Sequence, residues 1–136
     1  MAYKFEKLEV WDDVLAYIDL VYDLAAQLPK SEDFNLRSQI TRAATSIALN
    51  IAEGSTGQTD AEQARFLGLA IRSFIETVAC QHIIRRRQDF TDPAPLDLAY
   101  ARSSQLAMRL QAFRRSLTSR SRIVKEGTAD YLTNEL

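Results

Sequence analysis

The chain has 136 residues, with 17 Lys and Arg against 18 Asp and Glu, and a formal net charge of -1. This length fits one domain, and a hydrophobic fraction of 46% with a charged fraction of 26% excludes a disordered tail, a collagen-like chain and a membrane span. The single cysteine, Cys80, excludes an internal disulfide, and the near-neutral charge argues against a protein that coats nucleic acid with bulk positive charge.

Glycine and proline are few, and most of them cluster at three points that divide the chain into long segments with helical periodicity. The segments cover residues 8–28, 35–53, 60–90 and 94–120. Short connections between four helices predict an all-α fold, an up-down-up-down antiparallel four-helix bundle over residues 1–120 with a C-terminal tail over 121–136. The N-terminus has no apolar signal region, which favours a cytoplasmic protein.

The first segment, 8–28, is unusually apolar, because 15 of its 21 residues are apolar. Its main seam advances in steps of three and four through Leu8, Trp11, Leu15, Ile18, Tyr22 and Ala25. A bundle helix needs an apolar face of about 100° or somewhat more, and this helix exceeds it. The excess predicts either a deeply buried helix or, as we favour, a subunit interface at the heptad positions Val14, Val21 and Leu28.

The second segment, 35–53, carries a polar stripe at helical spacing: Gln39, Arg42, Ser46, Asn50 and Glu53. One interpretation is that this stripe faces solvent. The other is a hydrogen-bonded network with Ser73 and Glu76 of the third segment, and it predicts an ion pair between Arg42 and Glu76. Gly54 is expected to close this helix in the left-handed conformation.

The third segment, 60–90, begins with a capping box at Thr59 and Glu62 and ends with three arginines that suit a helix C-terminus. It also holds the only histidine, His82, and Cys80. Two residues apart on a helix, these side chains point in different directions, so a Cys-His nucleophile pair is not expected. One histidine also excludes a di-metal carboxylate site, and we expect no catalytic residues, metal or cofactor.

The fourth segment, 94–120, repeats apolar and small residues in strict steps of three and four. From this segment into the tail, seven basic residues occur with no acidic residue among them: Arg102, Arg109, Arg114, Arg115, Arg120, Arg122 and Lys125. The first segment, in contrast, has five acidic residues and no basic one. The two charged stripes either neutralise each other between neighbouring helices, or the basic one binds RNA or DNA with salt-dependent affinity.

Residues 39–54 read QITRAATSIALNIAEG. This stretch resembles the signature of the four-helix bundle proteins first known from intervening sequences of bacterial 23S rRNA genes, close to Q-I-x-R-A-x-x-S-I-x-x-N-I-A-E-G. Further similarities extend the resemblance over about residues 5–90, and their positions are Leu8, Trp11, Pro29, Glu32, Phe66, Leu67, Ala70, Ser73 and Glu76. One departure is Arg72, where the family commonly has glycine before the serine of its third helix.

The resemblance implies a four-helix bundle that assembles as a ring-like homopentamer. It also implies kinship with the accessory variability determinant of diversity-generating retroelements, a pentameric barrel that binds a reverse transcriptase and nucleic acid. Together with the residue patterns, it leads us to expect a non-enzymatic homo-oligomeric scaffold or adaptor, with no membrane partner and no small-molecule substrate. The alternative is an RNA-binding accessory protein, or a partner of a nucleic-acid-processing protein, that uses the basic fourth helix.

Overall fold

Four α-helices form the molecule, in agreement with the predicted fold class. The computed structural model describes residues 3–57, 59–88 and 90–135, and side chains as far as residue 123. The α-helices are α1 (Glu9–Ala26), α2 (Leu36–Gly54), α3 (Asp60–Arg87) and α4 (Ala94–Glu135), with 3-10 turns η1 (Lys4–Lys7) and η2 (Lys30–Glu32). Within these ranges no strand occurs.

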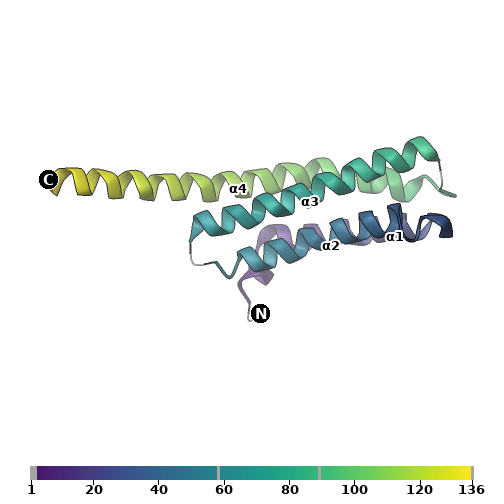
Figure 1. The fold of residues 1–136 in the computed structure, drawn as a ribbon, viewed down its shortest axis with the longest axis horizontal. Helices are drawn as coiled ribbons and strands as arrows, with labels where there is room; N and C mark the ends of the chain where they lie inside the picture. Colours follow the sequence, from purple (N-terminus) through teal and green to yellow (C-terminus); the bar gives the residue numbers. More distant parts are fainter. Residues whose placement is uncertain (1–2, 58, 89, 136) are drawn as a thin grey trace.

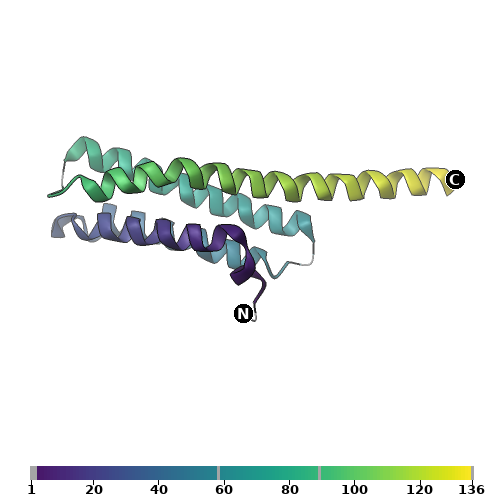
Figure 2. The ribbon, with the colours of Figure 1, turned by 180° about the vertical axis from the view of Figure 1, so that it is seen from behind.

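The helices are antiparallel neighbours in chain order (Figures 1 and 2). Helix α1 packs between α2 and α4, and α3 likewise packs between α2 and α4. Helices α1 and α3 therefore occupy opposite corners of the bundle, so their outward ridges face in different directions.

The core residues of α4 follow the steps of three and four that the sequence predicts for this helix. Leu96, Ala99, Leu106, Leu110 and Leu117 are each at most 3% exposed, and Phe113 packs against the same core from a partly buried position. Burial of a large aliphatic side chain contributes roughly 1.5–3 kcal/mol, so this seam is a major part of what holds α4 to the other helices.

Helix α4 does not end near residue 120. It continues to Glu135 as one 42-residue helix, so the segment predicted as a tail is helical as far as this residue, and residue 136 lies outside the described part of the chain. At about 1.5 Å per residue the helix is about 63 Å long. Figure 1 shows its C-terminal part projecting beyond the other three helices.

The helix ends confirm one predicted cap and correct another. Thr59 caps the start of α3, and its hydroxyl accepts a hydrogen bond from the backbone N–H of Glu62 at 3.1 Å, which is one half of the predicted capping box. The Glu62 carboxylate pairs with Arg65 at 3.1 Å instead of completing the box. The prediction that Gly54 adopts the left-handed conformation is wrong, because no described glycine has a positive φ. The left-handed residue is Gln88, which closes α3 with φ of 57°.

Gly54 serves a packing purpose instead. A Cβ atom added there would lie 2.7 Å from the Cβ of Phe66, closer than real atoms approach. Phe66 belongs to α3, so the missing side chain lets α2 and α3 pack closely just before the turn between them. A side chain at this position would push the two helices apart.

This close packing predicts that alanine at residue 54 destabilises the protein, whereas helix propensity alone predicts that it stabilises the protein. We expect Gly54→Ala to lower the free energy of unfolding by about 1–3 kcal/mol through overpacking, although alanine is the better helix former. Gly68→Ala is the matched control, because a Cβ there meets only the movable end of Arg114, 3.2 Å away, and we expect it to be neutral or stabilising by up to about 1 kcal/mol. Urea unfolding of both variants measures the difference, and equal effects would contradict the close-packing role.

Helix α3 is long and apolar enough, by length and composition alone, to cross a membrane. Core helices of water-soluble bundles pass the same test, so this finding is weak evidence for a span. One face of α3 is buried against α2 and α4 through residues such as Leu67, Ala70 and Phe74. The bundle core therefore explains part of its apolar composition, while Ile75 and Ile83 of the same helix remain exposed.

Candidate functional site

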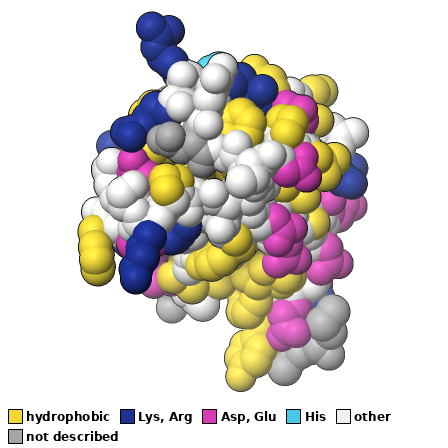
Figure 3. Space-filling model, turned by 90° about the vertical axis from the view of Figure 1, so that its right-hand side faces the viewer, with side chains coloured by type: hydrophobic (Ala, Val, Ile, Leu, Met, Phe, Trp, Pro, Cys, Tyr) yellow, Lys and Arg dark blue, Asp and Glu magenta, His cyan; other side chains and the backbone are white. Residues whose placement is uncertain are grey.

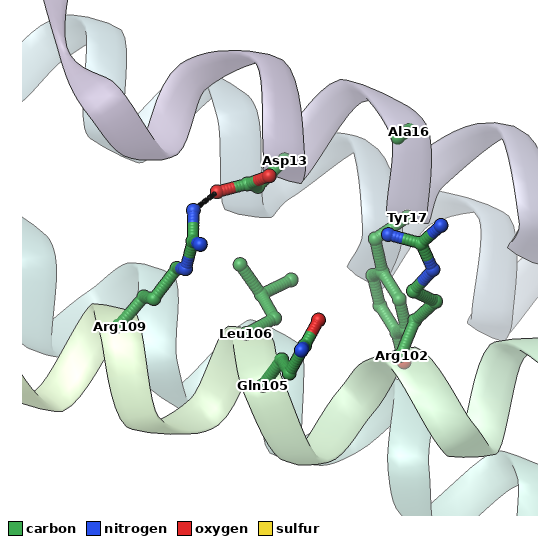
Figure 4. Close-up of a pocket in the computed structure, with 7 residues that line it drawn as sticks. All are labelled: Asp13, Ala16, Tyr17, Arg102, Gln105, Leu106 and Arg109. Carbon is green, nitrogen blue, oxygen red and sulfur yellow. Dashed lines mark hydrogen bonds and ion pairs between the residues drawn. The ribbon is translucent and has the colours of Figure 1, made fainter.

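The cleft between α1 and α4 shows how the two charged stripes meet. Figure 4 shows Arg109 of α4 pointing to Asp13 of α1, where the two side chains form an ion pair, and Arg102 reaching towards α1 beside Tyr17. The stripes thus touch at one edge, as expected for neighbouring helices. Only one of the acidic residues of α1 takes part, since no other one forms an ion pair with a described residue.

Several of the predicted nucleic-acid-binding arginines have partners within the chain. Arg120 forms an ion pair with Asp60 at 3.1 Å, and the Nε of Arg114 donates to the backbone carbonyl of Ala64 at 3.3 Å. Arg122 also has an interaction partner, whereas Arg102 and Arg115 are exposed and form no ion pair with any described residue. The side chain of Lys125 lies outside the described part of the chain.

The polar stripe of α2 borders a groove between α2 and α3. The groove is lined by Gln39, Arg42, Ala43, Ser46, Ser73 and Glu76. The hydroxyls of Ser46 and Ser73 lie 2.9 Å apart and join the two helices by a hydrogen bond. Asn50 donates to the carbonyl and the hydroxyl of Ser46 at 2.9 and 3.0 Å, so part of the predicted network is present.

The outer members of this stripe stay in solvent. Arg42 and Glu76 face the same groove, but no ion pair joins them, so the predicted direct pair is not formed. Glu53 and Gln39 are exposed as well. Long side chains at the rim of an open groove gain little from pairing in water, because a surface ion pair contributes about 0–1 kcal/mol.

The predicted subunit-interface residues of α1 are instead part of the core. Val14 and Val21 are 0% exposed and Leu28 is 3% exposed within the protomer, so they cannot contact another subunit and this prediction was wrong. The reason is geometric: α1 is apolar around more than half of its circumference, so periodicity alone did not decide which stripe faces inward.

The exposed apolar residues of α1 come from the stripe that was expected to face the bundle. Leu15 is 39% exposed and Tyr22 is 48% exposed, and Leu49 of α2, 59% exposed, lies on the neighbouring helix. The Tyr22 hydroxyl lies 2.9 Å from the hydroxyl of Thr45 and ties α1 to α2 at this surface. We call Leu15, Tyr22 and Leu49 the apolar face. Leu49 was not identified from the sequence as an exposed apolar residue. Its position could have indicated this, because it lies seven residues, or two helical turns, after the exposed Arg42.

A buried polar cluster joins α1 to α3 inside the bundle. Thr77 donates to the carbonyl of Phe74 at 2.6 Å, Tyr17 donates to the Thr77 hydroxyl at 2.7 Å, and the Gln81 amide donates to the Tyr17 oxygen at 2.7 Å. Burial raises the pKa of the Tyr17 hydroxyl, and the hydrogen bonds to Thr77 and Gln81 oppose that rise only in part. The carbonyl oxygen of Gln81 is buried, and no described residue donates a hydrogen bond to it.

Groups that could perform nucleophilic catalysis are not brought together. Cys80 is buried, and burial, followed by the negative charge of Glu76, raises the pKa of its thiol, which disfavours the reactive thiolate. His82 is exposed and its ring meets Tyr100 edge-on, with centroids 5.7 Å apart. No group of three or more His, Cys, Asp or Glu side chains that could hold a metal ion is found among the described residues.

Comparison with known proteins matches the chain to a protein family and to solved structures. A family model described as 23S rRNA-intervening sequence protein matches residues 6–112, which extends the resemblance into α4. A solved structure of a protein with unknown function from the S23 ribosomal protein family, from Bacteroides thetaiotaomicron, is similar with a TM-score of 0.68 at 24% identity, covering 77% of this chain and 97% of that one. That similarity supports the fold, and no curated protein matches the chain.

Proposed function

The chain belongs to the 23S rRNA-intervening sequence protein family, and we propose that it acts as a homo-oligomeric, non-enzymatic scaffold or adaptor in the cytoplasm. Neither the family nor the similar solved structure brings an enzymatic activity with it. The proposal therefore depends on surfaces that a second copy or another protein can contact.

The apolar face is the observation that carries the proposal. Leu15, Tyr22 and Leu49 expose large side chains on two adjacent helices that Tyr22 and Thr45 hold in register. Contiguous exposed apolar surface on a water-soluble protein marks an interaction site more often than a solvated one. Assembly of copies through this face removes it from water and stabilises the complex by the hydrophobic effect.

The number of subunits in this proposal comes from the family resemblance, which implies a ring of five. Five copies of the 15.4 kDa chain give a particle of about 77 kDa. The absence of enzymatic activity is supported by the separate positions of Cys80 and His82, since one is buried and the other exposed.

A double substitution tests the role of the apolar face. We expect Leu15→Glu with Leu49→Glu to convert the oligomer to monomer, because two charges would have to be buried in the contact. Phe34→Glu is the matched control: Phe34 is 100% exposed in the turn before α2, and the same change there should leave the mass unchanged. Light scattering after size exclusion gives the masses, and circular dichroism verifies that all variants fold; an unchanged mass of a folded double variant would refute this role.

The nucleic-acid alternative is favoured by Arg102 and Arg115, two exposed α4 arginines that form neither an ion pair nor a hydrogen bond with a described residue. It is weakened by the internal partners of Arg109, Arg114 and Arg120, which leave a smaller basic surface than the sequence suggested. Fluorescence anisotropy with a short RNA at low and high salt tests it. Binding that weakens steeply with salt and is lost in Arg102→Glu/Arg115→Glu supports the alternative, and no binding at low salt rejects it.

A further inference from the structure

One ridge of α1 combines acidic and apolar side chains and faces away from the bundle. Asp12, Leu15, Asp19, Tyr22 and Asp23 recur at helical spacing, and all five are exposed. None of the three aspartates forms an ion pair with a described residue, and no basic residue interrupts the ridge. We call these five residues the acidic strip.

The outward ridge of α3 has the opposite charge and also combines charged with apolar side chains. Arg72, Ile75, Ala79, Ile83 and Arg86 advance in steps of three and four, and all five are exposed. Ile75 is 55% exposed and Ile83 is 48% exposed, and neither arginine forms an ion pair within the described part of the chain. We call these residues the basic strip.

The two strips are similar in length and opposite in charge. From Asp12 to Asp23 the acidic strip is about 17 Å long, and from Arg72 to Arg86 the basic strip is about 21 Å long, at about 1.5 Å per residue. The end view in Figure 3 shows the same segregation, with acidic side chains mainly on one side of the bundle and basic side chains mainly on another.

Because α1 and α3 lie at opposite corners, the acidic strip cannot reach the basic strip of its own chain. We propose that the acidic strip of one copy docks on the basic strip of the next copy. The inference depends on the proposed self-assembly. It adds which two surfaces meet and how the copies are arranged relative to each other. Two different surfaces in contact make a heterologous, head-to-tail interface, the kind that closes into rings.

Charge and burial both favour a second copy as the occupant of the basic strip. Aspartates oppose arginines across the contact, and the apolar pairs Leu15 and Tyr22 on one side and Ile75 and Ile83 on the other leave water together. A nucleic-acid backbone would neutralise the arginines but would leave the two isoleucines against charged phosphates. The basic strip is therefore better suited to a protein surface.

Arg72 gives this interface its specificity. It is exposed at one end of the basic strip, where its charge can face the acidic strip of the next copy. A guanidinium can bind a carboxylate through two parallel hydrogen bonds, which fixes the orientation of the two copies.

Charge reversal on each strip tests the proposal. We expect Asp19→Arg/Asp23→Arg and Arg72→Glu/Arg86→Glu each to raise the concentration for half-assembly at least about tenfold, because like charges then face each other. An equimolar mixture of the two variants should regain association, since the reversed strips are complementary. Arg115→Glu/Lys30→Glu, an equal charge change at exposed sites outside both strips, should assemble as the unaltered protein does. Sedimentation velocity measures the masses, and thermal unfolding verifies that each variant folds.

The outcomes separate this inference from the proposed function. Loss of assembly in both single-strip variants with recovery in the mixture supports the docking of one strip on the other. Unchanged masses in both variants, while the unaltered protein is oligomeric, overturn the inference and leave self-assembly intact. A monomeric unaltered protein overturns both. Unchanged mass combined with loss of RNA binding in Arg72→Glu/Arg86→Glu would assign the basic strip to nucleic acid and also overturn the inference.

Discussion

Replacing Tyr17 by phenylalanine should destabilise the bundle by about 1–3 kcal/mol, because it leaves a buried amide without a hydrogen-bond partner. Tyr17 is 1% exposed and Gln81 is also 1% exposed, so water cannot take over the lost contact. The Gln81 carbonyl already lacks a partner among the described residues, and without the tyrosine oxygen its amide N–H would lack one too. Urea unfolding gives the change in the free energy of unfolding.

A second substitution distinguishes the lost hydrogen bond from a change in packing. In the double variant Tyr17→Phe/Gln81→Met both polar groups become apolar at similar volume, which can be nearly neutral. We therefore expect the double variant to be more stable than Tyr17→Phe alone. If the two losses simply add, the residues of the buried cluster contribute to stability independently and not as a unit.

The same residue predicts how stability depends on alkaline pH. The folded state raises the pKa of Tyr17, so it holds this proton more tightly than the unfolded chain does. Its contribution to stability is present below the usual tyrosine pKa of about 10 and declines as the pH rises from there through the folded value. The Tyr17→Phe variant should therefore lose less stability at alkaline pH than the unaltered protein does. Cys80 acts in the same sense, but it is present in both proteins and cancels in the comparison.

Glu32→Gln should lower the free energy of unfolding by about 1–3 kcal/mol, since Glu32 is a buried acceptor for charged and backbone donors. Its carboxylate accepts from the side chain of Asn35 at 2.9 Å and from the N–H of Leu36, the first residue of α2, at 3.3 Å, and it pairs with Arg87 at 3.0 Å. One carboxylate thus joins the start of α2 to the end of α3.

An exposed ion pair at the same end of the bundle supplies the control. Asp97 and Arg85 form a 2.7 Å pair in which both side chains are about half exposed. We expect Asp97→Asn to cost no more than about 1 kcal/mol, because solvent screens the charges and competes for the hydrogen bonds. Thermal unfolding of both variants compares the pairs, and equal costs would show that burial of Glu32 does not matter.

The sequence predicted the helices well because their signals are local. Gly and Pro positions gave the number of helices, Thr59 gave the start of α3, and the steps through Leu96, Leu106 and Leu110 gave the buried seam of α4. These features depend on spacing along one helix, and spacing is visible in a single sequence.

The predictions that failed depend on which neighbour packs on which side. Val14 and Leu15 are both apolar, and only packing against α2 and α4 decides that the first is buried and the second exposed. Gly54 was expected to adopt the left-handed backbone conformation, but the close approach of Phe66 is the reason that a residue without a side chain is needed there. The Tyr17 cluster was also missed, although Thr77 and Gln81 interrupt the buried apolar stripe of α3 and so signalled a buried polar contact.

The central claim is that this bundle works by assembling with copies of itself. Native mass spectrometry of the unaltered full chain, from nuclease-treated samples over a range of concentrations, tests it most directly. We expect one dominant species of about 77 kDa, five times the 15.4 kDa chain, that contains no nucleic acid. A mass of 15.4 kDa at every concentration would contradict it.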